Sequence, residues 1–133
     1  MHSREKKSLI GILEAIADTK SLEMFREIAK GSVESQVLKH KEGLSKKQYY
    51  VRTGQLMNAG LVQRIKGRFS LTNLGTVIYH ANLIMEAGVN NYWKLKAIDS
   101  IQESGRIGEE ERMKLIKTIL NDNAIESILV RQR

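Results

Sequence analysis

Residues 39–68 contain the side chains whose types and spacing point most clearly to a chemistry. The chain of 133 residues has a formal net charge of +7. Glu42 is the only acidic residue in this segment, whereas basic and acidic residues balance on both sides of it. An ordinary solvated surface intersperses charges of both signs. The basic residues of the segment are Lys39, Lys41, Lys46, Lys47, Arg52, Arg64, Lys66 and Arg68. They account for the whole net charge, and such a concentration is typical of a surface that binds a polyanion.

Polar and aromatic side chains lie among these cations. They are Gln48, Tyr49, Tyr50, Thr53 and Gln55. Amide, hydroxyl and ring groups are able to contact bases and sugars. The combination favours nucleic acid over a simple acidic surface as the partner.

The rest of the chain offers little for catalysis or metal binding. Cysteine is absent, and the three histidines, His2, His40 and His80, are far apart. Residues 109–111 are three consecutive glutamates at the expected start of a helix, where carboxylates complement the helix dipole. His80 beside Tyr79 is the remaining candidate acid–base pair, but a lone histidine on an amphipathic helix is more often structural. We therefore expect no catalytic residue, no metal and no cofactor.

Length and composition predict one globular domain, or one small domain with an appendage. Hydrophobic residues make up 41% of the chain and charged residues 28%, as in ordinary globular proteins. No apolar run reaches the roughly 20 residues that span a bilayer. Residues 1–18 resemble a secretion signal, but Leu9, Ile12, Leu13 and Ile16 have the spacing of an amphipathic helix. We expect that helix, no membrane partner and a cytoplasmic, nucleoid-associated location.

Helix signals place the basic residues on a defined element. The pattern predicts a helix from Thr19 or Ser21 to Gly31, a short helix starting at Ser32, and a polar turn over 39–43. Residues 45–48 fit a capping box, and the helix that they start is expected to run to Asn58. Its expected core-facing residues are Tyr49, Thr53, Leu56 and Met57.

A β-hairpin and further helices follow. Two short runs over 61–72, joined by a turn at Gly67, predict one hairpin. Residues 74–104 are periodic enough for one long helix, or for two helices bent near Gly88. Further helices are expected over 109–120 and 124–130. The expected fold class is mainly α with one small β-hairpin.

This order of elements is that of a winged helix-turn-helix domain followed by a C-terminal helical extension. Three segments resemble small single-wing archaeal winged-helix regulators: 44–50 and 56–62 at the two ends of a recognition helix, and 67–75 at the wing and its exit. The resemblance covers about residues 20–96. It implies a domain at 19–80 that places its basic helix in the major groove of DNA.

The resemblance also implies roles for individual residues. Lys47, Gln48 and Arg52 are expected to read base edges, while Ser45, Lys46 and Tyr50 contact phosphates. Arg64, Lys66 and Arg68 are expected to hold the wing to the DNA backbone. The whole expected site is Ser45, Lys46, Lys47, Gln48, Tyr50, Val51, Arg52, Gln55, Arg64, Lys66, Gly67 and Arg68.

Together these observations predict a sequence-specific protein of double-stranded DNA that regulates transcription. Two alternatives use the same basic surface: a winged-helix module that docks an acidic protein in transcription or repair machinery, and a chromatin-coating protein without sequence preference. For residues 81–133 there are also two interpretations. The helices either form a homodimer or complete the core of the monomer.

Overall fold

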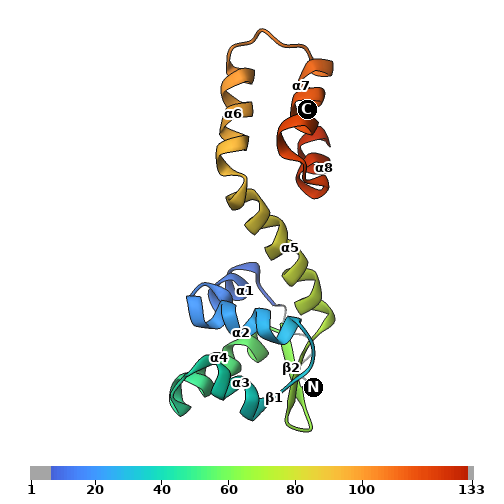
Figure 1. Cartoon of the computed structure of the whole chain (residues 1–133). Helices are drawn as coiled ribbons and strands as arrows, with labels where there is room; N and C mark the ends of the chain where they lie inside the picture. The colour runs from blue at the N-terminus through green and yellow to red at the C-terminus, as the bar shows by residue number, and fades with distance from the viewer. Residues whose placement is uncertain (1–6, 132–133) are drawn as a thin grey trace. The chain divides into compact units, whose positions relative to one another are not determined.

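The computed structural model describes residues 7–131, which divide into two compact units between His80 and Ala81 (Figure 1). Unit 1 ends at His80 and unit 2 begins at Ala81, and each is described by itself. The first six residues of the expected N-terminal segment 1–18 lie outside the described part. The described chain is mainly helical. Its elements are α1 (Leu9–Ile16), α2 (Thr19–Ala29), β1 (Val33–Glu34), α3 (Ser35–Glu42), α4 (Lys46–Asn58), β2 (Val62–Ile65), β3 (Arg68–Leu71), α5 (Asn73–Asn90), α6 (Tyr92–Glu103), α7 (Glu109–Leu120) and α8 (Asn123–Arg131).

The first two helices, α1 and α2, belong to unit 1. The α1 helix buries Ile12, Ala15 and Ile16, whereas Leu9 and Leu13 are exposed. The expected helix is present, and Leu9 and Leu13 of its apolar stripe are exposed because the buried face is centred closer to Ala15. At α2 the cap is Asp18, whose carboxylate accepts from the backbone N–H of Ser21 at 2.9 Å, rather than Thr19 or Ser21.

A three-stranded antiparallel sheet, in the order β1-β3-β2, replaces the isolated hairpin that the sequence predicts. In β1, Val33 pairs with Phe69 and Glu34 pairs with Arg68. The helix expected from Ser32 therefore starts later, at Ser35, and continues through the turn expected over 39–43. Gly43, with φ of 63°, ends that helix in the left-handed conformation that glycine adopts without steric cost.

The core of unit 1 lies between its helices and the sheet. It confirms three of the four α4 residues expected there, Tyr49, Thr53 and Leu56, whereas Met57 is 37% exposed. The largest side chains around them are Met24, Phe25, Ile28, Leu38, Leu61 and Phe69.

The start of α5 packs against the segment that leads into β2. Thr72 caps α5 by accepting from the Gly75 N–H at 2.9 Å. A Cβ at Gly75 would overlap the Leu61 carbonyl, so only glycine allows this approach. The periodic segment 74–104 forms two helices, and the break lies at Asn91 rather than near Gly88.

Unit 2 has a small core of its own. Ile98 of α6, Ile116 and Leu120 of α7 and Ile125 of α8 are buried together. The helices expected over 109–120 and 124–130 are present as α7 and α8, and Asp122 between them accepts from the Ile125 N–H at 3.0 Å. Within residues 7–131, each helix is too short or too polar to cross a lipid bilayer.

Candidate nucleic-acid interface

The capping box at Ser45 fixes the start of α4. The Ser45 hydroxyl accepts from the Gln48 N–H at 3.2 Å, and the Gln48 side-chain oxygen accepts from the Ser45 N–H at 3.1 Å. The side-chain oxygen of Gln48 therefore already accepts a hydrogen bond within the capping box, and only its NH₂ group is left to donate to a partner. Bidentate reading of adenine needs both groups of a glutamine amide, so Gln48 is better placed to donate one hydrogen bond.

The exposed face of α4 carries the expected contact residues. Tyr49, Thr53 and Leu56 face the core, and the remaining positions face outward or lie at the flanks. Arg52 and Gly54 are half-buried. The exposed residues of the expected site on α4 are Lys46, Lys47, Gln48, Tyr50, Val51 and Gln55.

Positive charge at the start of α4 opposes the helix dipole. Lys46 and Lys47 occupy the first turn, which contains no acidic residue. The positive end of a helix favours carboxylates, and cations there destabilise the helix. By contrast α7 begins with three glutamates. A helix N-terminus with added cations instead suits a bound anion such as a phosphate group.

Arg52 is held by a residue from outside the basic segment. Its Nε donates to the Asp18 carboxylate at 3.3 Å, and its side chain is 24% exposed. Three groups lower the pKa of Asp18: foremost the backbone N–H of Ser21, then the Ser21 hydroxyl and Arg52. The ion pair ties α4 to the start of α2, and it leaves the two terminal NH₂ groups of Arg52 as the donors available to a partner.

The hairpin presents a cation at its tip. Lys66 and Gly67 have φ of 53° and 76°, and two positive φ values in a two-residue loop are typical of a type I′ turn. Lys66 is exposed there. Arg64, on the preceding strand, is exposed with its guanidinium 5.8 Å from the centre of the Phe69 ring.

Arg68 works mainly inside the sheet. Its Nε donates to the Ser32 hydroxyl at 2.9 Å, and its terminal nitrogens donate to the Ser32 carbonyl at 3.0 Å and to the Glu34 carboxylate at 3.3 Å. The neighbouring Gly67 carbonyl accepts from the Ser35 N–H at 2.9 Å. These contacts fix the hairpin against β1 and α3.

The eight cations of residues 39–68 therefore divide by partner. Lys41, Arg52 and Arg68 pair with Glu27, Asp18 and Glu34 respectively. The expectation that the whole segment lacks acidic partners was wrong for these three, because folding brings carboxylates from residues 18–34 to them. The cations that form no hydrogen bond or ion pair with any residue of 7–131 are Lys39, Lys46, Lys47, Arg64 and Lys66.

Within unit 1, α4 contacts β2. The turn between α3 and α4 and the tip of the hairpin both lie at the lower edge of this unit in Figure 1. The α1 helix contacts α4 and lies above it in that view. The start of α4 and the hairpin tip thus project on the side of unit 1 away from α1.

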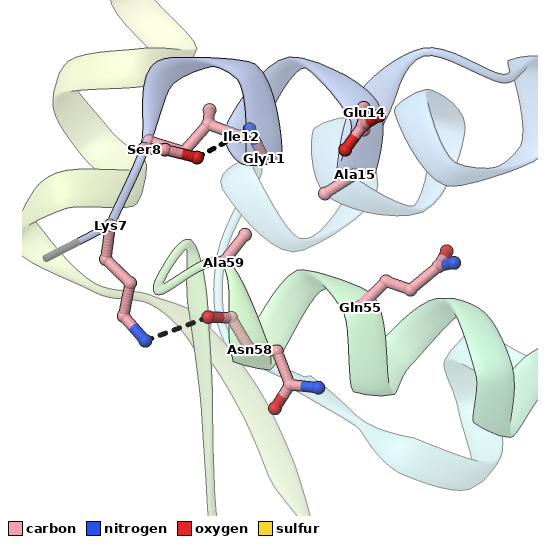
Figure 2. A pocket seen from close by; sticks show the side chains of 9 residues that line it. All are labelled: Lys7, Ser8, Gly11, Ile12, Glu14, Ala15, Gln55, Asn58 and Ala59. Carbon is pink, nitrogen blue, oxygen red and sulfur yellow. Dashed lines mark hydrogen bonds between the residues drawn. The ribbon is translucent and has the colours of Figure 1, made fainter. Parts of the chain in front are cut away.

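An open groove of about 360 Å³ separates α1 from the last turns of α4 (Figure 2). Gln55 and Asn58 line it from α4, Gly11 and Glu14 line it from α1, and Lys7 lines it from just before α1. The Lys7 ammonium donates to the Asn58 carbonyl at 2.9 Å. Gln55 therefore lies on the α1 side of α4, apart from the hairpin side.

Two buried hydroxyl groups, those of Tyr49 and Ser35, hold the core-facing side of α4. The Tyr49 hydroxyl donates to the Ser35 carbonyl at 3.0 Å and lies 2.5 Å from the Ser35 hydroxyl. Burial raises the pKa of Tyr49, which keeps the phenol protonated. Sequence reasoning missed Ser35 and also Asp18. For Asp18 a signal was present, because aspartate is one of the residues favoured at the N-cap of a helix.

Tyr79 and His80, the candidate acid–base pair, are neighbours on α5. Tyr79 packs edge-on against Phe25 at 6.2 Å, and its ring lies 5.7 Å from that of His80. Within residues 7–131, no three His, Asp or Glu side chains come together as metal ligands would.

Comparisons with known proteins identify no relative. No family model matches the chain, and neither a curated protein nor a solved structure matches it significantly.

Proposed function

We propose that unit 1 is a winged helix-turn-helix domain that binds double-stranded DNA and regulates transcription. The α3–turn–α4 pair supplies the helix-turn-helix, and β2 and β3 supply the wing. The observation that carries the proposal is the start of α4. Two exposed lysines stand there at the positive end of the helix, with no acidic residue in its first turn. This arrangement costs stability in the free protein and is relieved when a phosphate binds.

The contacts divide into those that position the protein and those that read sequence. Lys46, Tyr50 and Lys66 are proposed to contact phosphates, which hold the domain on any duplex. Lys47 and Val51, on the exposed face of α4, are proposed to meet base edges together with the NH₂ group of Gln48. Arg52 reaches a base edge only through its terminal nitrogens, because its Nε is bound to Asp18.

The wing is proposed to contact the DNA backbone beside the groove. Lys66 at the tip and Arg64 on β2 have no carboxylate partner among residues 7–131, so they remain available to phosphates. Arg68 is expected to act on DNA indirectly, since three hydrogen bonds hold it to Ser32 and Glu34. DNA binding of this kind would place the protein on the nucleoid in the cytoplasm. A homodimer would double the contacts, and it stays a prediction.

Selection of bound duplexes from a random pool tests this proposal. We expect an enriched motif that the wild-type protein binds at least about tenfold more tightly than random duplex, a difference of 1.4 kcal/mol. Lys47→Ala should reduce that ratio, whereas Lys66→Ala should weaken both duplexes alike. Lys114→Ala, an exposed lysine of α7 in unit 2, is the matched control and should change neither.

The outcomes separate the alternatives. Equal binding of all duplexes would favour a chromatin-coating protein. An absence of duplex binding at low salt would contradict the proposal and favour the module that docks an acidic protein.

A further inference from the structure

Three of the four helices that contribute to unit 2 bury apolar residues against one another. The buried residues of its core are Ile98, Ile116, Leu120 and Ile125, from α6, α7 and α8. Arg112 also donates to the Leu129 carbonyl at 3.2 Å, which ties α7 to α8. The residues of this core therefore need no second chain to cover them.

The α5 helix differs, because it contributes only Ala87 to that core. Val89 is 74% exposed, Met85 60% and Ile84 40%. Together with Ala81 and Gly88 they stand at positions i, i+3, i+4, i+7 and i+8, which is one face of a helix. We call Ala81, Ile84, Met85, Gly88 and Val89 the α5 stripe. It continues into two exposed aromatic residues at the start of α6, Tyr92 and Trp93.

The α5 stripe contains no charged residue, and this favours a partner that also presents an uncharged face. Glu86 is the only Asp, Glu, Lys or Arg in α5, and it lies off the stripe and half-buried. A nucleic acid or an acidic peptide would find no cation here. Two copies of a chain with a net charge of +7 repel one another at residues 39–68, but they can meet at an uncharged face. In a two-fold contact each residue lies near its own counterpart, so a stripe without charge brings no like charges together.

The small residues of the stripe also favour a helix of a second copy as the partner. Ala81 and Gly88 are seven residues apart, the spacing that keeps positions in register along two paired helices. A Cβ at Gly88 would meet no atom within 4 Å. The fold of a single chain therefore does not require glycine there, although glycine in a helix interior is unfavourable. Close approach of a second helix explains its presence.

We propose that the α5 stripe pairs with the α5 stripe of a second copy and makes the protein a homodimer. This inference does not depend on DNA binding, and it is tested without DNA. Sedimentation equilibrium of the full chain should give a species of about 30 kDa, twice the 15.1 kDa of one chain. Val89→Lys should raise the dissociation constant of the dimer at least about tenfold, because it places two ammonium groups in the contact.

The control for this variant is Ile128→Lys. Ile128 is an exposed apolar residue of α8 outside the stripe, at 45% exposure, and its substitution should leave the dimer unchanged. A variant that adds no charge is Gly88→Ala. It should weaken the dimer while leaving the helix content of the monomer unchanged or higher, since its methyl group meets only open space in one chain.

The chain contains no cysteine, so single cysteines report proximity without background. Under mild oxidation Val89→Cys should give a disulfide-linked dimer, and Ile128→Cys should not. Three results would overturn the proposal: a monomer at high micromolar concentration, a dimer that Val89→Lys leaves intact, or a monomer that floats with uncharged phosphatidylcholine vesicles. The last result would assign the stripe to a lipid surface.

Discussion

Lys47 and Arg52 lie on the same helix and carry the same charge, yet their surroundings differ. Lys47 is exposed and has no ion pair with residues 7–131, whereas Arg52 is half-buried and bonded to Asp18. Residue type alone cannot make this distinction, because the carboxylate comes from a helix that precedes the basic segment. The cations that are free to bind an anion are therefore a subset of those that composition identifies.

Tyr49 provides a test of how α4 is held. Tyr49→Phe removes the hydroxyl that the Ser35 carbonyl and hydroxyl contact in the core. Because buried polar groups then lose their partner, the free energy of unfolding should fall by about 1–3 kcal/mol. Urea denaturation measures this change, and Tyr50→Phe, at an exposed neighbour, is the control that should have little effect. Equal stability of wild type and Tyr49→Phe would contradict the buried network.

Asp18 gives a pH-dependent prediction whose sign follows from its lowered pKa. A carboxyl whose pKa is lower in the folded state stabilises the fold above its unfolded pKa of about 3.9 and loses that contribution as pH falls through the folded value. Asp18→Asn retains a capping residue but loses the charge that pairs with Arg52. At pH 7 it should lower the free energy of unfolding by at most about 1 kcal/mol, since the pair is partly exposed.

Below the folded pKa of Asp18, the wild type and Asp18→Asn should unfold at the same urea concentration. Glu34→Gln, which removes the more exposed ion pair with Arg68, is the comparison for effects of charge alone. A stability difference that stays constant from pH 7 into the acid range would contradict the assignment.

At the scale of elements, α4 contains a glycine that its own fold does not need. A Cβ at Gly54 would meet no atom within 4 Å. Gly54→Ala should therefore stabilise the protein by up to about 1 kcal/mol through helix propensity. If α4 lies against DNA, the added methyl group should at the same time weaken duplex binding. Thermal unfolding and a fluorescence titration on one preparation measure the two effects. Unchanged DNA affinity would show that Gly54 lies away from the contact surface.

The elements with strong local signals were predictable from the sequence. The capping box correctly predicted where α4 starts, and the turn at Gly67 correctly predicted the hairpin. The strand β1 was not predictable, because two residues are too few to show a period and its formation depends on β3, more than 30 residues away. For the same reason the start of α3 was placed three residues too early.

The burial of residues at helix edges was less predictable than the helices themselves. Leu9, Leu13 and Met57 are apolar and have suitable spacing, but they lie exposed beside the buried faces. Periodicity gives the direction of a face, while its width depends on the packing of neighbouring helices. The exposed side of α4 was predicted correctly, since the polar residues there leave only one face for the core.

For the whole molecule, charge and apolar surface are found on different parts of the chain. The unpaired cations of residues 39–68 lie on α3, α4 and the hairpin of unit 1, whereas the uncharged stripe lies on the part of α5 that belongs to unit 2. Each feature has its own proposed partner, DNA for the first and a second copy for the other. One function can therefore be removed by substitution without removing the other.

The salt dependence of duplex binding tests the central claim most directly. The three unpaired cations proposed to contact phosphates, Lys46, Arg64 and Lys66, predict a slope of about −2.7 per protomer for log K against log[salt]. Lys46→Ala or Lys66→Ala should reduce the magnitude of that slope by about 1, and Lys114→Ala should leave it unchanged. A slope near zero, or the same slope in all four proteins, would contradict a DNA-binding surface formed by α4 and the hairpin.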